Sequence, residues 1–134
     1  MTYQFTPLPE PGDIVWCYFP HQEDAGAPGP KERPALVIRV SEADHAVQVA
    51  YGTSKRTHQI HKGEFVMDPA DGGFQISGLS VRTKFDLNRR EQLYFDAEYF
   101  APAPGVHTQS PLPKMGTMHS SYYAELQKAA SQIT

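Results

Sequence analysis

Hydrophobic residues occur along this chain in short runs that are separated by stretches rich in Gly, Pro and polar residues. Runs of this length, with many β-branched and aromatic residues, are typical of strands rather than of helices. The pattern predicts strands over residues 14–19, 34–40, 46–51, 64–67 and 81–87. The last of these alternates most clearly, with Val81, Thr83, Phe85 and Leu87 on one face and Arg82, Lys84 and Asp86 on the other.

Three segments lack such a pattern and predict irregular structure. Residues 1–11 carry three prolines and indicate an extended lead-in without a helix. Residues 20–32 have much Gly and Pro and predict a long loop between two core strands, a kind of loop that is often functional. Residues 101–118 hold four prolines among small and polar residues, so we expect a linker over the surface.

The last residues, 119–134, predict a helix. Ser120 or Ser121 can cap its first turn, and we expect the helix to pack on the sheet. Its apolar stripe carries Tyr122, Leu126, Ala129 or Ala130, and Ile133. Together with a strand-rich domain over residues 12–100, this predicts a mainly β fold, a small barrel of five to seven strands with a C-terminal helix.

Composition and charge narrow the class of protein. The 134 residues suit one domain, and a formal net charge of -3 argues against a strongly basic nucleic-acid binder, so any such role depends on a local patch. Cys17 is the single cysteine, and its apolar surroundings favour a core residue over a nucleophile. The longest apolar run is too short to cross a bilayer and the first residues do not resemble a signal peptide, so we expect a cytoplasmic protein with no membrane contact.

Two basic stretches are candidates for anion binding. Arg33 stands at the start of an apolar strand, where a guanidinium can hold a phosphate; alternatively, it covers the rim of the barrel or pairs with a local acid. The segment from Thr53 through Ser54, Lys55 and Arg56 offers hydroxyls, backbone N–H groups and positive charge. An ordinary solvated strand end explains this segment equally well.

A candidate carboxylate, Asp86, occurs further along the chain, two residues after Lys84. Lys84 and Asp86 project to one side of the predicted strand, where they either act on one phosphate as a base and a stabilising cation or form a weak surface ion pair. His58 and His61 lack a recognisable set of metal ligands nearby, and we expect no metal and no cofactor.

Three motifs occur in a characteristic order: Gly12-Asp13-Ile14-Val15-Trp16, Arg33-Pro34-Ala35-Leu36-Val37-Ile38 and Val49-Ala50-Tyr51-Gly52-Thr53-Ser54. In this order and spacing, over roughly residues 11 to 100, the chain resembles the PemK/MazF toxins of toxin–antitoxin systems. The resemblance implies an SH3-like barrel, usually a homodimer, that cleaves single-stranded messenger RNA without a metal and is neutralised by a cognate antitoxin.

The resemblance also implies roles for individual residues. Arg33 and Thr53 match active-site positions of the family. Asp86 matches the carboxylate of an acid–base pair in which Lys84 stands where the family has arginine, and His21 is a possible match for a loop histidine. With Ser54, Lys55 and Arg56, His21 and Lys84 are expected to bind substrate.

The hypothesis that follows is attack of an RNA 2′-hydroxyl on the adjacent phosphate, giving a 2′,3′-cyclic phosphate and a 5′-hydroxyl. Asp86 would take the proton, Arg33 would stabilise the phosphate charge and Thr53 would orient the phosphate. The alternative is a non-catalytic relative of the same barrel, either a CcdB-like poison of DNA gyrase or a plain binding module, because fold alone does not separate these functions.

Overall fold

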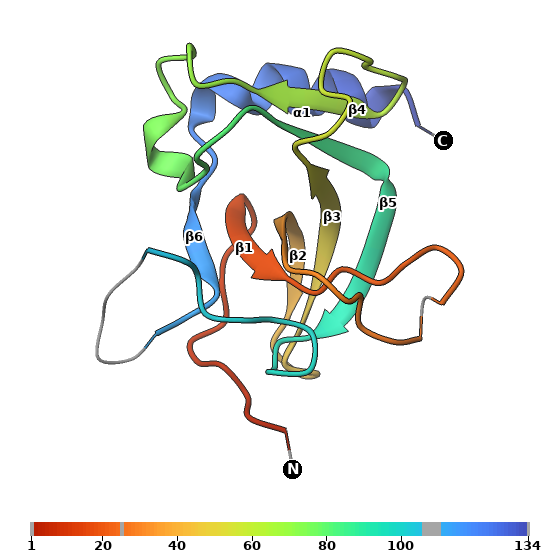
Figure 1. The fold of residues 1–134 in the computed structure, drawn as a ribbon, viewed down its shortest axis with the longest axis vertical. Helices are drawn as coiled ribbons and strands as arrows, with labels where there is room; N and C mark the ends of the chain where they lie inside the picture. Colours follow the sequence, from red (N-terminus) through yellow and green to blue (C-terminus); the bar gives the residue numbers. More distant parts are fainter. Residues whose placement is uncertain (1, 25, 106–110, 134) are drawn as a thin grey trace.

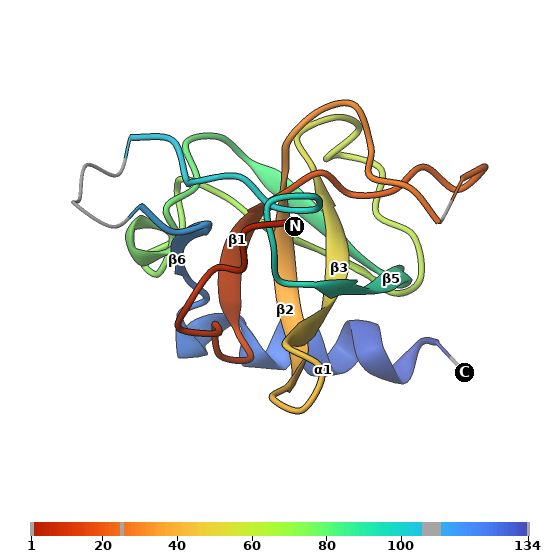
Figure 2. The same ribbon diagram turned by 90° about the horizontal axis from the view of Figure 1, so that it is seen from below.

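The protein is described here by a computed structural model that covers residues 2–24, 26–105 and 111–133. Its main element is one curled antiparallel sheet of six strands in the order β4-β5-β3-β2-β1-β6, closed along one end by a helix (Figures 1 and 2). The strands are β1 (Asp13–Cys17), β2 (Arg33–Ser41), β3 (Ala46–Thr53), β4 (Glu64–Met67), β5 (Thr83–Tyr94) and β6 (Lys114–Thr117). The helix is α1 (Tyr123–Ser131), and two short 3-10 turns are η1 (Gln75–Ser77) and η2 (Ser120–Tyr122).

This architecture confirms the predicted mainly β fold with a C-terminal helix. The predicted strand over 64–67 has the observed bounds, and those over 14–19, 34–40 and 46–51 differ at their ends. The predicted strand over 81–87 is displaced and longer, because Val81 lies outside β5 and is exposed while the strand continues to Tyr94. No helix of the described residues is long and apolar enough to cross a membrane.

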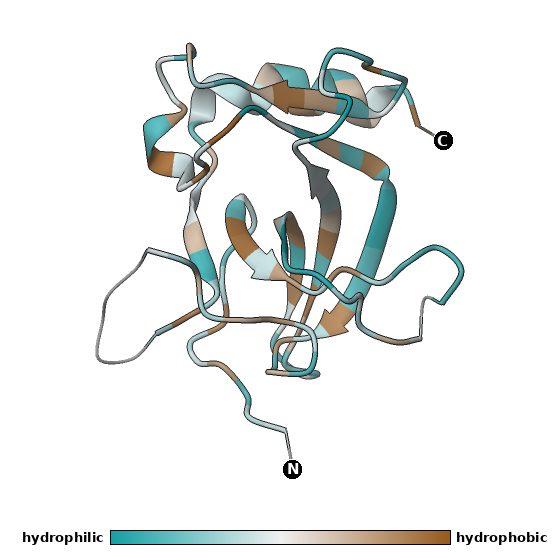
Figure 3. Ribbon diagram, in the orientation of Figure 1, coloured by the Kyte–Doolittle hydropathy of each residue, from teal (hydrophilic) through white to brown (hydrophobic). Residues whose placement is uncertain are grey.

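Two hydrophobic cores lie on the two faces of the sheet, as the alternation along each strand requires. The middles of β1, β3 and β4 are hydrophobic, whereas the middle of β5 is hydrophilic (Figure 3). The first core is formed by Phe5, Val15, Cys17, Phe19, Ala35, Val37, Val47, Val49, Leu93, Phe95 and Phe100. The second core is formed by Ile14, Leu36, Ala50, Phe65, Met67, Phe74, Phe85, Leu87, Met118, Tyr122 and Ala129.

Helix α1 covers the second core. Ala129 is buried, and Leu126 and Ile133 pack beside it, so the predicted stripe does face the sheet. Tyr122 fixes the start of the helix by donating a hydrogen bond of 2.7 Å from its hydroxyl to Oδ2 of Asp71. Burial and this bond raise the pKa of the Tyr122 hydroxyl far above its usual range.

The predicted surface linker over 101–118 is corrected in its last part. Residues 114–117 form β6, which pairs with β1 through Asp13↔Thr117 and Ile14↔Gly116. Lys114 adds an ion pair of 3.4 Å to the buried Asp13 carboxylate. The prolines correctly excluded a helix here, but a short edge strand needs only alternate N–H donors and tolerates such a composition. Residues 106–110 of this segment lie outside the described part of the chain.

A large bulge in β5 divides the sheet. Ala50 on β3 is opposite Arg90, but the next residue, Tyr51, is opposite Asp86, so residues 87–89 have no partner on β3. A bulge bends its strand and re-aims side chains, and bulges are frequent near active sites. Here it carries Arg89 over the face of the sheet that holds Tyr51.

The long loop between β1 and β2 is closed at its base. The backbone N–H of Gly29 donates to the carbonyl of Tyr18 over 3.0 Å. A Cβ at Gly29 would collide with the carbonyl oxygen of Phe19, so this close approach requires glycine. The two ends of the loop are therefore held side by side next to the start of β2.

Cys17 is fully buried in the first core, as predicted for a core residue. Burial raises the pKa of its thiol far above the usual range, which suppresses the thiolate that reacts with electrophiles. We expect the native protein not to react with iodoacetamide at pH 8, and the urea-unfolded protein to react fully, as measured by mass spectrometry. Rapid alkylation of the native protein would contradict the burial of Cys17.

Candidate functional site

A polar region occupies the sheet face of the first core, beyond the point where that core ends. Alternate residues of β3 on this face are Val49, Tyr51 and Thr53, and only Val49 is fully buried. On β5 the matching positions are Asp86, opposite Tyr51, and Lys84, opposite Thr53. The strands therefore continue past the core and carry polar side chains on a rigid support, as binding sites require.

Tyr51 is the centre of this region. The guanidinium carbon of Arg89 lies 3.9 Å from the centroid of the Tyr51 ring, and that of Arg33 lies 5.7 Å from it. Arg89 also lies 5.6 Å from the Phe19 ring, which packs edge-on against Tyr51 at 5.3 Å between centroids. Stacking on aromatic rings holds a guanidinium in place without neutralising it.

Arg33 lines a small pocket together with side chains from the long loop. The pocket has a volume of about 70 Å³ and is lined by Arg33, His21, Lys31, Tyr51 and Arg89, with Phe19, Pro20 and Pro30. We call it the Arg33 pocket. Within residues 2–24, 26–105 and 111–133, neither Arg33, Lys31 nor Arg89 forms an ion pair. The pocket thus gathers positive charge that is not neutralised by the parts of the protein described here, which suits an anion.

Asp86 lies beyond Tyr51, on β5, and opposite Glu64 of β4 on its other side. Its Oδ1 accepts hydrogen bonds from the backbone N–H (2.9 Å) and the side-chain amide (3.0 Å) of Asn88. The amide of Asn88 also donates to the carbonyl of Lys62 over 2.8 Å. No hydrogen bond from the described residues reaches Oδ2 of Asp86, so one oxygen is fixed and the other is available.

Thr53 is the last residue of β3, the strand that lies between β2, which carries Arg33, and β5, which carries Asp86. Its hydroxyl accepts a hydrogen bond of 3.1 Å from the backbone N–H of Lys55, which shapes the turn into the next loop. The structure therefore brings Arg33 and His21 into one pocket, while Thr53 and Asp86 flank Tyr51 on neighbouring strands and do not line that pocket.

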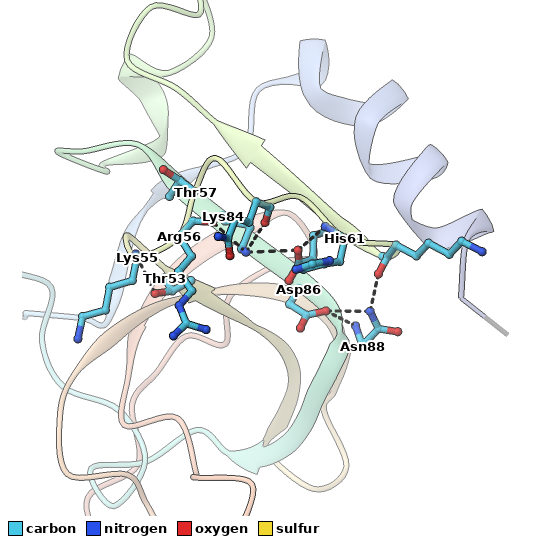
Figure 4. A network of polar contacts seen from close by, with 12 residues as sticks. Thr53, Lys55, Arg56, Thr57, His61, Lys84, Asp86 and Asn88 are labelled. Atoms are coloured by element: carbon cyan, nitrogen blue, oxygen red, sulfur yellow. Dashed lines mark hydrogen bonds and ion pairs between the residues drawn. The ribbon is translucent and has the colours of Figure 1, made fainter.

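Lys84 is the most connected side chain of the region (Figure 4). Its ammonium donates to the carbonyls of Arg56 (3.1 Å) and Gln59 (2.7 Å) and lies 3.3 Å from Oε1 of Glu64. These partners use all three N–H donors of the group. The expected surface pair with Asp86 is thus corrected, because Lys84 is buried and pairs with Glu64. With its donors occupied, Lys84 positions the loop after β3 rather than contacting a ligand.

A second cation anchors the same loop. Arg82 donates to the carbonyl of Thr57 over 3.2 Å and pairs with Asp68 at 2.7 Å. Its guanidinium holds the pKa of the Asp68 carboxyl below the usual range. Lys84 of β5 and Arg82, directly before β5, therefore hold the loop through carbonyls between residues 56 and 59. The side chains of Ser54, Lys55 and Arg56 are all exposed along it.

The described part of the chain contains no candidate metal site. No group of three or more His, Cys, Asp or Glu side chains comes together there. His58 and His61 are both exposed on the loop.

The sequence did not indicate Tyr51, Lys31 or Arg89 as site residues. Tyr51 shares its strand face with Thr53, so period-2 spacing from Thr53 was a usable signal. The position of Arg89 depends on the β5 bulge, for which the sequence contains no clear signal.

Comparisons with known proteins show a similarity in fold to a solved structure. No protein-family model matches the chain, and no curated protein matches it. Among solved structures, an endoribonuclease in complex with its cognate antitoxin, from a mycobacterial species, superposes with a TM-score of 0.54. The match covers 92% of this chain and 91% of that chain at 14% sequence identity. The chain thus has the fold of that endoribonuclease, in agreement with its resemblance to the PemK/MazF toxins.

We expect Lys84→Met to lower the free energy of unfolding by about 3 kcal/mol or more, because it leaves the carboxylate of Glu64, 10% exposed, without its cation. The loop 54–62 should also become accessible to protease. Urea unfolding and limited proteolysis measure the two effects. Lys62→Met removes an exposed cation nearby and serves as the control. Equal stability of the two variants would show that the buried contacts of Lys84 do not anchor the loop.

Proposed function

We propose that this protein is an endoribonuclease that cleaves single-stranded RNA, messenger RNA included. The observation that carries the proposal is the Arg33 pocket, where a guanidinium without an ion pair in the described structure lies beside His21 and Lys31. This is the electrostatic environment that stabilises a phosphate during transfer. The fold of an endoribonuclease and the matching PemK/MazF motifs support the same reaction.

The reaction uses a nucleophile that the substrate itself supplies. The 2′-oxygen of one ribose attacks the adjacent phosphorus, the bond from phosphorus to the 5′-oxygen breaks, and a 2′,3′-cyclic phosphate and a 5′-hydroxyl form. The proton from the 2′-hydroxyl goes to a base, and the 5′-oxygen takes a proton from solvent. DNA lacks the 2′-hydroxyl and is not cleaved. Side chains supply the charge, and the proposed reaction requires no metal.

Each predicted site residue other than Lys84 has a part in this reaction. Asp86 is the base, because Asn88 orients its carboxylate while Oδ2 stays available. Arg33 binds the phosphate oxygens and stabilises their developing charge, and His21 contacts the same phosphate from the pocket wall. Thr53 orients the phosphate between them. The exposed side chains of Ser54, Lys55 and Arg56 bind the RNA backbone on the 54–62 loop.

Two protein partners belong to the proposal. The mycobacterial endoribonuclease is described with its cognate antitoxin, and we propose that an antitoxin likewise inhibits this protein. A homodimer, the usual assembly of PemK/MazF toxins, is proposed as the active form, and the cytoplasm as its location.

A second candidate function rests on Lys84. The PemK/MazF pattern has an arginine in an acid–base pair with the carboxylate, whereas here the Lys84 ammonium at that position is fully engaged with Arg56, Gln59 and Glu64. This favours, as the alternative, a non-catalytic protein that uses the same barrel to bind a protein partner, as the gyrase poisons of the CcdB type do.

We expect the purified protein, with a chelator present, to cut a long single-stranded RNA at discrete positions that carry 5′-hydroxyl ends. Arg33→Ala should lower the cleavage rate on the order of 100-fold or more, because it removes a donor that stabilises the phosphate charge. Arg39→Ala is the matched control, since it removes an exposed arginine from the other end of the same strand. Primer extension and kinase labelling of the new ends measure position and chemistry.

The outcomes separate the two candidate functions. Cleavage that is equal in the Arg33 and Arg39 variants would remove Arg33 from the reaction. Absence of any cut by folded protein, together with capture of gyrase or another protein, would replace the nuclease with the binder.

A further inference from the structure

We propose that a second pocket next to Arg89 binds one guanine base of the RNA, and that Glu91 reads this base. The proposal deepens the proposed function and rests on it. The pocket has a volume of about 290 Å³ and is lined by Gln22, Asn88, Arg89, Arg90 and Glu91, with Phe19 and Pro20. We call it the Glu91 pocket.

The Glu91 pocket adjoins the Arg33 pocket. Both are lined by Phe19, Pro20 and Arg89, so the same guanidinium forms a wall of each. A nucleotide offers two groups of matching character side by side, a compact phosphate and a larger planar base. The smaller, cationic pocket suits the phosphate, and the larger pocket, with both hydrogen-bond donors and an acceptor, suits the base.

Arg89 supplies a surface for the base. One face of its guanidinium is stacked over Tyr51 at 3.9 Å, and Arg89 also lines the Glu91 pocket. Single-stranded bases are commonly bound by stacking on aromatic rings or on guanidinium planes. Arg89, which lines the Arg33 pocket, thus also presents a flat surface to the base in the Glu91 pocket.

Glu91 supplies the selectivity. It lies opposite Val49, on the sheet face of the first core, and is half-buried. In the described parts of the chain its carboxylate forms no hydrogen bond or ion pair, although Arg89 and Arg90 line the same pocket. A partly buried carboxylate without a partner has acceptors to offer a ligand.

The chemistry of the four bases then favours guanine. A carboxylate has two acceptor oxygens and is best satisfied by two adjacent N–H donors. On its Watson–Crick edge, guanine presents such a pair, N1–H and the exocyclic amine. Adenine and cytosine present one donor beside an acceptor, and uracil presents one donor between two acceptors, so each would place a lone pair against the carboxylate.

The test measures binding rather than cleavage, so that it does not depend on the reaction. The probes are short fluorescent 2′-fluoro oligouridylates, which lack the nucleophile, with one central guanosine, inosine or adenosine. We expect the parent protein to bind the guanosine strand about 10-fold or more tightly than the other two, because inosine lacks the exocyclic amine and adenosine lacks both donors. Fluorescence anisotropy at fixed low salt measures the dissociation constants.

Two variants that carry the same chemical change test whether Glu91 causes the guanosine preference. Glu91→Gln should reduce the guanosine preference to about 2-fold or less, since a neutral amide offers a single acceptor oxygen. Glu42→Gln changes an exposed glutamate in the turn between β2 and β3 and should retain the full preference. Circular dichroism and thermal unfolding confirm that both variants fold.

The outcomes test the guanine pocket and the proposed nuclease activity separately. Equal binding of the three strands by the parent, or a preference that survives Glu91→Gln, would overturn the inference while RNA cleavage still supported the nuclease. A guanosine preference lost in Glu91→Gln, without cleavage of long RNA, would support the base pocket and overturn the nuclease. Absence of binding to any strand would overturn both.

Discussion

The buried ammonium of Lys84 is the interaction on which the candidate site depends. Transfer of an ammonium out of water is unfavourable unless its donors and its charge are satisfied. Here two loop carbonyls satisfy the donors and Glu64 balances the charge. Because both carbonyls belong to the segment after β3, the electrostatic demand of one side chain fixes the path of a whole loop. The exposed cations of that loop take their places as a consequence.

The bulge in β5 provides the second constraint, and it explains why one sheet face holds both a dry core and a polar site. A regular strand would place its residues alternately on the two faces and would continue the pairing with β3. The three unpaired residues instead bend β5 and bring Arg89 over Tyr51. Pairing resumes at Arg90, opposite Ala50, and the next residue, Glu91, faces the pocket beside that guanidinium. A local irregularity of the backbone thus joins an anion pocket to a larger neighbouring pocket.

Sequence reasoning succeeded where one physical rule dominated each segment. Period-2 alternation and apolar runs located β2, β3 and β4, and the stripe through Tyr122 and Ala129 correctly placed the helix on the sheet. It failed where tertiary contacts decided the outcome. The alternation around Lys84 predicted a solvent-facing side chain, because the loop that buries it is distant in sequence. Strand β6 was missed for a similar reason, since a short edge strand is specified by its neighbour β1 rather than by its own composition. Within the site, the closed base of the long loop brings Arg33 and His21 together, whereas the position of Arg89 depends on a bulge for which the sequence has no local pattern.

The charge distribution connects the two proposed pockets. With a net charge of -3, the whole protein repels RNA at long range, so the general electrostatic attraction that drives non-specific binding by basic proteins is weak here. Binding must then come from short-range contacts at the site, where Arg33, Lys31 and Arg89 lie within reach of one nucleotide. A protein in this situation gains little from long-range attraction to RNA and much from a base that fits. An acidic nuclease with a carboxylate in its base pocket is therefore coherent physically. Its net negative charge weakens indiscriminate binding, and the carboxylate of Glu91 selects for a base that donates two hydrogen bonds.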